Sequence, residues 1–514
     1  MSGHVFLVGP RGARSSRVLA TVLGIAGLSF AAGCDDGTTT TTTSSGQSSS
    51  SSSSGSTGGM GGEGGMGGGG MGGGGGMGGG GMGGGGGMGG GSSEAKPVIV
   101  ALSENGHDRF LGVTHDSQGN IYTTGIVSDG ADAAADFATI VAKFTPAGEL
   151  DEAFGTKGIA THNIIVGKGG EIARGIVVQS TGKIVVAGTV EHDGAADERD
   201  RDVAALRFNT DGTLDTTFGT NGVAILDLSD GELVGTTYVA DTQWGLNLAA
   251  NDKLVITGAQ KAPGRTDLDF AVVQLDADGK LDTTFGTNGV TLVDIALQGA
   301  SPKSATILGD GSIVMAGYTR DMDSIVSPVL FKLTPAGQLD PTFGAGGIFN
   351  QIVLGAVTEA YAVALQGTNF VTAGYGRNSA ADSLDWISLR IGANGTLDTT
   401  YGESGVAKVD VAGFNDNARS LVTLPDNRLL LVGGGRSTMD DSNATVGVLM
   451  ADGKIDTTFD AKGVKTYDLG GASDFFWGVS MSPDKKTVAI VGASGNAAGM
   501  GDDDAAIMLM PASL

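Results

Sequence analysis

The chain has 514 residues with a single cysteine, and its 56 acidic against 31 basic side chains give a formal net charge of −25 at pH 7. A chain this acidic repels nucleic acid and anionic lipid surfaces, so nucleic-acid binding is excluded. One cysteine cannot form an internal disulfide, so the folded part must be held together by core burial alone.

The N-terminus predicts export. Arg11, Arg14 and Arg17 precede an uncharged apolar stretch at 18–32, which is short for a bilayer span and ends in small residues before Cys34. This arrangement resembles the signal of bacterial lipoproteins, in which that cysteine is lipidated. The resemblance implies a membrane anchor on Cys34 and a place in the bacterial cell envelope, at the outer membrane, the cell surface or the periplasm. An ordinary secretory signal followed by a chance cysteine is the alternative.

The next segment has a biased composition. Thr and Ser runs give way to a glycine tract punctuated by methionine. No apolar face can form there, and glycine loses much entropy when it is ordered, so a disordered tether is predicted. A soft metal-binding role for the spaced methionines is the alternative. The predicted domains are a signal peptide at 1–33, the lipidated cysteine and linker at 34–95, and a folded body at 96–514.

A phrase of the form LDxxFGxxG occurs six times in the folded body. Its aspartates are Asp151, Asp215, Asp282, Asp340, Asp398 and Asp456. Successive copies lie 58 to 67 residues apart, which indicates one structural unit stacked many times. Each aspartate is expected to accept backbone N–H bonds in a tight turn, and the aromatic residue three positions later to supply a buried ring.

Strand patterns recur between the phrases. One strand follows the phrase, as in GVAILDL from Gly222, then a hairpin such as GLNLAANDKLVITG from Gly245, then a strand such as DFAVVQLDADG from Asp269. β-branched and small residues alternate, and Gly, Asn and Asp occupy the turns, which is typical of strands. The hairpin occurs seven times, with a first strand at Pro97, a last one at Ala505 and no polar capping repeat. This predicts an all-β, seven-bladed β-propeller of four-stranded repeats, with the six phrases at the junctions between units, and an open β-solenoid is the alternative.

The phrase, the hairpin and the Asp-led strand together resemble the delta-60 repeat family over nearly all of residues 97–514. The resemblance implies a β-propeller in an exported bacterial protein. It implies no catalytic residue, because the family carries no agreed activity. The sequence departs from the pattern at Asp460, where the other copies have Gly, and at Tyr401, which replaces Phe.

Signals of catalysis and of metal binding are weak. The histidines of the folded body are His107, His115, His162 and His192, and none has HExxH spacing. A metal pair of His107 and His115 is the alternative to solvated loop histidines. The segment DADGKLD from Asp276 resembles a calcium loop, but its equivalents TPAGELD and TPAGQLD lack the carboxylates, which favours a turn. The sequence therefore predicts no catalytic residue, no cofactor and no metal.

Two sets of residues are predicted to lie on the face that carries the variable loops, where propeller function is expected. The first set, one residue before the small residue that opens the first strand of each hairpin, is Leu111, Arg174, Trp244, Lys303, Tyr361, Arg419 and Trp477. The second set, three residues past the glycine that ends the next strand, is Lys261, Arg320, Arg377 and Arg436. Basic side chains gathered in so acidic a chain predict an anion- or glycan-binding face, with Arg on carboxylate and aromatic rings on sugar.

A structural interpretation stays open beside this one. The aromatic residues would pack between units, and nearby carboxylates would neutralise the arginines: Asp321, Asp323, Asp382, Asp385, Asp440 and Asp441. The predicted function is that of a monomeric, non-enzymatic envelope lipoprotein whose propeller binds acidic glycans or a protein partner. The alternative is an extracellular carboxylate- or metal-dependent hydrolase or lyase that acts on a polysaccharide or lactone.

Overall fold

The computed structural model describes residues 95–514, apart from short gaps at 104–105, 131–134, 167–170, 192–199, 235–236, 296–298, 322, 439–440 and 496–502. The predicted signal, Cys34 and nearly all of the linker lie outside the described residues and stay expectations. His192 and Asp440 also lie outside them. Within the described part, no helix is both long and apolar enough to cross a bilayer.

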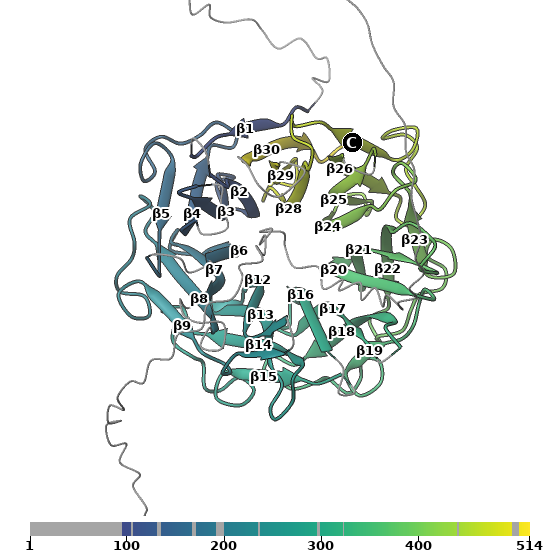
Figure 1. Cartoon of the computed structure of the whole chain (residues 1–514), viewed down its shortest axis with the longest axis horizontal. Helices are drawn as coiled ribbons and strands as arrows, with labels where there is room; N and C mark the ends of the chain where they lie inside the picture. Colours follow the sequence, from purple (N-terminus) through teal and green to yellow (C-terminus); the bar gives the residue numbers. More distant parts are fainter. Residues whose placement is uncertain are drawn as a thin grey trace, which may run out of the picture. The chain divides into compact units, whose positions relative to one another are not determined.

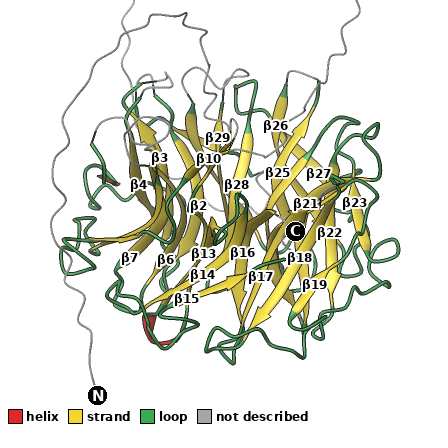
Figure 2. Ribbon diagram, turned by 60° about the horizontal axis from the view of Figure 1, so that its bottom comes forward, coloured by secondary structure: helices red, strands yellow, loops and turns green. Residues whose placement is uncertain are grey.

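The structure is a β-propeller, as the sequence predicted. All of its strands lie in one compact unit, whose described part begins at Pro97. Short antiparallel sheets stand around a common axis (Figure 1), and strands and loops make up nearly everything that is described (Figure 2). The one helical piece in the described ranges is the 3-10 turn η1 (Ala250–Asp252).

The strands of the first three sheets follow one another from the axis outward. The first sheet holds β2 (Arg109–His115), β3 (Ile121–Ser128), β4 (Phe137–Phe144) and β5 (Ile159–His162). The second holds β6 (Glu171–Val178), β7 (Ile184–Glu191), β8 (Arg201–Phe208) and β9 (Val223–Leu226). The third holds β12 (Thr242–Leu248), β13 (Leu254–Lys261), β14 (Leu268–Leu275) and β15 (Val290–Val293), and the hairpin of β10 (Glu232–Val234) and β11 (Thr237–Val239) precedes it.

The remaining sheets repeat this order. The fourth holds β16 (Gly299–Ile307), β17 (Ile313–Arg320), β18 (Val326–Leu333) and β19 (Ile348–Asn350). The fifth holds β20 (Val357–Gln366), β21 (Asn369–Arg377), β22 (Asp385–Ile391) and β23 (Val406–Val409), and one parallel bridge, Val326 to Val357, joins it to the fourth. The sixth holds β24 (Asn417–Thr423), β25 (Leu429–Arg436), β26 (Ser442–Leu449) and β27 (Val464–Tyr467). The last holds β28 (Phe475–Met481), β29 (Thr487–Ser494), β30 (Asp504–Pro511) and the N-terminal β1 (Val98–Val100).

The sequence repeat and the sheet are out of phase by one strand. The strand after each phrase pairs with the strand before it, as β9 does with β8 through Leu226 and Val203. The LDxxFG phrase is therefore a connection inside a sheet, and not the junction between units that the repeat pattern suggested. The same shift leaves β1 as the outer strand of the last sheet, where Ile99 pairs with Ala506 of β30.

Apolar side chains fill the spaces between neighbouring sheets. The second strand of each sheet is buried on both faces, so it is apolar almost throughout rather than alternating, as in IVVAGTVE of β7. One core joins the second and third sheets around Phe218, and another joins the first sheet to the last through Phe110 and Val491. Each sheet is therefore stabilised by burial against its two neighbours.

Each phrase builds the same turn, as predicted. A carboxylate oxygen of its aspartate accepts the N–H two residues later at 2.9–3.2 Å in all six copies. The ring is fully buried in five of them: Phe154, Phe218, Phe285, Phe343 and Tyr401. The glycine after the ring donates its N–H to a turn of the following sheet, as Gly219 does to the Asp278 carbonyl at 2.9 Å. The phrase thus links successive sheets.

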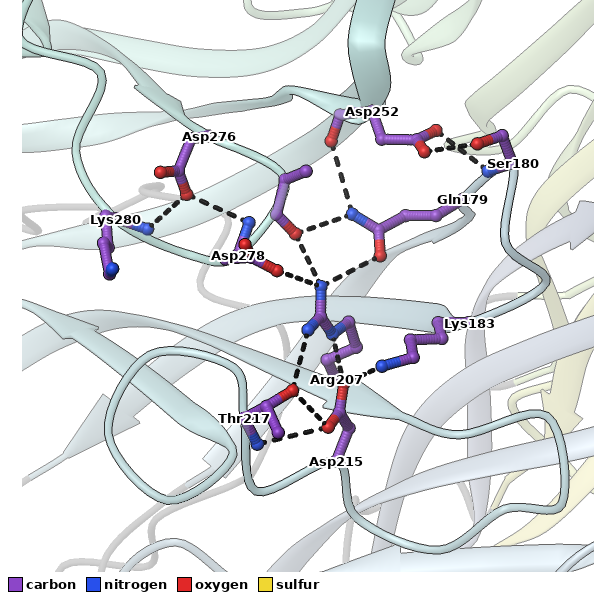
Figure 3. A network of polar contacts seen from close by, with 11 residues as sticks. Gln179, Ser180, Lys183, Arg207, Asp215, Thr217, Asp252, Asp276, Asp278 and Lys280 are labelled. Carbon is purple, nitrogen blue, oxygen red and sulfur yellow. Dashed lines mark hydrogen bonds and ion pairs between the residues drawn. The ribbon is translucent and has the colours of Figure 1, made fainter.

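Polar contacts reinforce one of these links (Figure 3). Arg207 Nε donates to Asp215 at 2.6 Å, while Nη1 donates to the Ala277 carbonyl at 2.7 Å and to Asp278 at 3.1 Å in the next sheet. In DADGKLD, Asp276 accepts the N–H groups of Asp278 and Lys280, so this segment is a turn, as the comparison with its equivalents favoured.

The sixth phrase differs from the other five in its aromatic ring and in the residue that follows the ring. Phe459 is only half-buried, and Asp460 replaces the glycine that elsewhere donates to the next sheet. No phrase follows in the last sheet, because β1 supplies its outer strand. The ring and the glycine of the sixth copy therefore have no later phrase to dock against, which accounts for the substitution.

Candidate ligand-binding ring on the propeller axis

The first predicted set lies at one structurally defined position. Every innermost strand carries a β-bulge, and in each sheet the residue skipped by the register is a member of this set. In β12, for example, the pairing shifts between Gln243 and Gly245, which leaves Trp244 in the bulge. A bulge redirects a side chain and often lies beside a functional site. These residues are thus in strands that line the axis, and not in the loops of the variable face.

Six of these side chains alternate between cation and aromatic ring around the axis. Arg174 lies 4.6 Å and Lys303 3.3 Å from the Trp244 ring centroid. Lys303 also lies 4.5 Å from the centroid of Tyr361, and Arg419 lies 4.1 Å from Tyr361 and 5.4 Å from Trp477. Trp244 and Tyr361 come from the third and fifth sheets, yet their rings are 6.5 Å apart. The side chains therefore point toward the axis and contact one another. We call Leu111, Arg174, Trp244, Lys303, Tyr361, Arg419 and Trp477 the axial ring.

Accessibility is uneven around the axial ring. Lys303, Tyr361 and Arg419 are buried, and Tyr361 Oη also lies 3.2 Å from Tyr375 Oη. Burial raises the pKa of the Tyr361 hydroxyl well above its usual value, so this side chain is neutral. Arg174, Trp244 and Trp477 are only half-buried, and Arg174 and Trp477 flank Leu111, the one member of the axial ring that is neither cationic nor aromatic. Leu111 therefore interrupts the alternation of cations and aromatic rings, and beside it the Arg174 guanidinium and the Trp477 indole remain accessible.

The second predicted set lies at the rim and is spread over four sheets. Lys261, Arg320, Arg377 and Arg436 are the last residues of β13, β17, β21 and β25. Lys261 Nζ forms an ion pair of 2.9 Å with Glu232 on the β10–β11 hairpin. Arg377 Nη1 lies 3.5 Å from the carbonyl oxygens of Ala380 and Asp382.

The aspartates proposed to neutralise the rim have other contacts. Asp321 accepts the N–H groups of Asp323 and Ile325, and Asp382 accepts that of Ser379. Asp385 pairs with Lys408 at 2.5 Å. Asp321 and Asp382 therefore stabilise turns of their own loops.

The two histidines considered as a metal pair have separate partners. His107 Nδ1 lies 2.7 Å from Asp503, which also accepts a bond of 2.9 Å from Arg109 Nε. His115 Nδ1 lies 3.0 Å from Ser480 Oγ. Neither histidine belongs to the carboxylate groups that could hold a metal in the described ranges.

Buried carboxylates at the start of the inner strands were missed from the sequence. They lie three residues before the axial-ring residue in five repeats: Asp108, Glu171, Asp241, Asp416 and Asp474. Asp241, for instance, accepts the N–H groups of Leu228 and Ser229 and so fixes the crossover from the second sheet to the third. An Asp or Glu that recurs three residues before the axial-ring residue was the sequence signal that would have identified these carboxylates.

These carboxylates predict that stability falls as the pH rises from about 5 to 8. Burial raises the pKa of Glu171 and of Asp241 to about 7, so the folded state binds more protons than the unfolded state in this window. Ion pairs act in the opposite sense at low pH, because Lys253 lowers the pKa of Asp282 to about 2 and that stability is lost only as the pH falls toward 2. Calorimetry across this range should show the melting temperature declining above about pH 5, and less steeply in Asp241→Asn. A pH dependence of the melting temperature that is the same in the native protein and in Asp241→Asn would contradict the assignment.

Comparison with known proteins supports the fold. A family model described as a β-propeller domain of unknown function, DUF5122, matches residues 179–218, 249–285 and 308–343, which run from the turn of each inner hairpin to the aromatic residue of the phrase. No curated protein matches the chain.

Solved structures give remote likenesses only. A protein of unknown function from Dyadobacter fermentans is 11% identical with a TM-score of 0.41, covering 80% of this chain and 97% of that one. A glucose dehydrogenase is 9% identical with a TM-score of 0.38, covering 66% and 95%. An α-L-arabinofuranosidase from Fusarium graminearum is 12% identical with a TM-score of 0.38, covering 65% and 91%. The chain is thus similar, in three of its repeats, to a β-propeller domain whose function is not known.

Proposed function

We propose that this protein is a lipid-anchored binding module of the bacterial cell envelope, and that its axial ring recognises an acidic glycan. The observation that carries the proposal is the alternation of cations and aromatic rings at six of the seven bulges, within a chain of net charge −25. An acidic sugar offers complementary groups, because a guanidinium can fork onto its carboxylate while an indole stacks on its ring.

The accessible side of the axial ring sets the expected geometry. Arg174 would take the carboxylate and Trp477 would take the sugar face, with Leu111 between them as an apolar floor. Lys303 and Arg419 lie under aromatic side chains and are buried, so they add positive potential and hold the rings in place. Anchoring through Cys34 and the linker would present this propeller away from a membrane surface.

Binding should be measured with the full-length protein in detergent against a panel of uronic-acid and neutral oligosaccharides, with product release followed in parallel. Replacing Arg174 or Trp477 by Ala should weaken binding of an acidic oligosaccharide roughly tenfold to a hundredfold, the loss expected for a charge-assisted contact. Lys261→Ala is the matched control, because Lys261 is a rim cation that already pairs with Glu232.

Three outcomes would go against this proposal. Unchanged affinity in both axial-ring variants would place the ligand elsewhere. Affinity lost equally in Lys261→Ala would move it to the rim. Release of a shortened product would favour the alternative of an extracellular hydrolase or lyase.

A further inference from the structure

A cluster of three aspartates lies where the fifth sheet crosses over to the sixth, and no residue of the axial ring belongs to it. Asp385 begins β22, Asp410 follows β23, and Asp416 precedes β24, and one carboxylate oxygen of each lies within 4.8 Å of the other two. Asp385 is 1% exposed and Asp416 fully buried, whereas Asp410 is exposed. Two of the three carboxylates therefore lie in the interior, and the cluster is open to solvent at the third, Asp410.

The charge of this cluster is only partly compensated. Lys408 Nζ lies 2.5 Å from Asp385 Oδ2. Asp416 accepts the backbone N–H groups of Val411 at 2.8 Å and Arg436 at 3.0 Å, which are neutral donors. Asp385 Oδ1 is buried, and no hydrogen-bond partner for it lies within the described residues. A buried carboxylate oxygen of this kind calls for a partner, which in proteins is a donor or a metal.

The third sheet supplies an internal comparison, because there the chain fills the same place with a cation of its own. Asp269 and Asp294 occupy the positions of Asp385 and Asp410, since Asp269 pairs with Gln260 two residues past Gly258, as Asp385 pairs with Gly376 two residues past Gly374. Arg265 Nη2 donates to Asp269 at 2.6 Å and Nη1 to Asp294 at 2.9 Å.

The loop that carries Arg265 has the same length in the fifth sheet. Arg265 lies four residues before Asp269, and the residue four before Asp385 is Ala381. The carboxylates are retained there, while the guanidinium that bridges them in the third sheet is absent from its position.

We infer that Asp385, Asp410 and Asp416 form a Ca²⁺ site, in which the ion takes the place that Arg265 takes in the third sheet. All three ligands offer carboxylate oxygen, which Ca²⁺ prefers, and the exposed side leaves room for the waters that complete its coordination. The ion would bridge the end of β22 to the crossover into β24, and so brace the loop face between the fifth and sixth sheets. This inference is independent of the glycan proposal, since no residue of the axial ring takes part.

The test uses full-length protein in detergent that has been treated with a chelator. Tb³⁺ replaces Ca²⁺ at such sites, and Trp386, directly after Asp385, is placed to sensitise its luminescence. We expect saturable Tb³⁺ emission on indole excitation, displaced by Ca²⁺ and not by an equal concentration of Mg²⁺, with calorimetric Ca²⁺ affinity near the 10⁻⁴ to 10⁻³ M range of extracellular sites.

Two variants locate the site. Ala381→Arg should abolish binding by supplying the missing guanidinium from an exposed loop, and Asp410→Asn should weaken it at least about tenfold, since it removes one ligand charge. Asp294→Asn, in the cluster that Arg265 already fills, should leave Ca²⁺ affinity unchanged. No Ca²⁺ binding by the native protein, or binding retained in both Ala381→Arg and Asp410→Asn, would overturn the inference.

Discussion

Replacing Phe343 by Ala is expected to lower the free energy of unfolding by about 3–5 kcal/mol, whereas the same change at Phe459 should cost only about 1–2 kcal/mol. Phe343 is fully buried and packs edge-on against Phe370, with ring centroids 5.9 Å apart, in the core between the fourth and fifth sheets. Phe459 occupies the same place in the repeat but is half-buried, because no phrase follows it in the last sheet.

Comparing the two variants separates the contribution of ring burial between sheets from the contribution of the turn itself, which is the same in both phrases. Both changes remove the same atoms from the same turn, so the difference between their unfolding free energies, measured by denaturant titration, reports what the ring contributes to the contact between sheets. Equal costs for the two variants would mean that the phrase stabilises its own sheet only, and would contradict its role as a link.

The second large effect is expected at the contact between the first and last sheets. Asp503 is 1% exposed and accepts bonds from His107 Nδ1 at 2.7 Å and from Arg109 Nε at 2.9 Å. Asp503→Ala removes the charge that both side chains face and leaves a largely buried guanidinium without that partner. Loss of one member of a buried pair typically costs about 3–5 kcal/mol.

An exposed ion pair of the same sheet provides the control. Lys486 and Asp484 lie 3.2 Å apart with both side chains largely exposed, and Lys486→Ala, which leaves the turn bonds of Asp484 in place, should cost less than about 1 kcal/mol. Thermal unfolding of both variants should separate them clearly. A melting temperature of Asp503→Ala equal to that of Lys486→Ala would show that the His107–Asp503–Arg109 contact does not hold the first and last sheets together.

Much of this fold follows from repetition in the sequence. The six phrases predict the turn and the buried ring, because the aspartate and the aromatic residue recur at fixed spacing and each has one plausible physical use. The phase of the sheet does not follow, since a strand that comes after Gly222 can pair forward or backward along the chain with the same pattern. Only the pairing of β9 with β8 decides this.

The candidate site shows the same division. Each residue of the axial ring directly precedes a Gly, Ser or Ala, and this pattern identifies the set from the sequence. The small residue is needed because neighbouring inner strands approach closely beside the bulge. Gly112 illustrates this, because a side chain there would meet the Arg174 carbonyl oxygen at 2.3 Å. That these side chains meet across the axis is a property of the assembled ring of sheets, and no local pattern carries it. Equally, the carboxylates around Arg265 and Ala381 become comparable only once the sheets are superimposed.

Tryptophan fluorescence offers the most direct test of the axial ring as the binding site. Of the three tryptophans, Trp244 and Trp477 belong to the axial ring and Trp386 lies in the fifth sheet, where its indole N–H donates to the Gly434 carbonyl. A Trp386→Phe background therefore reports the axial ring alone. Titration of this full-length variant with an acidic oligosaccharide that binds in calorimetry should change its emission with the same saturation curve. Calorimetric binding with no change in emission would place the glycan elsewhere and contradict the account.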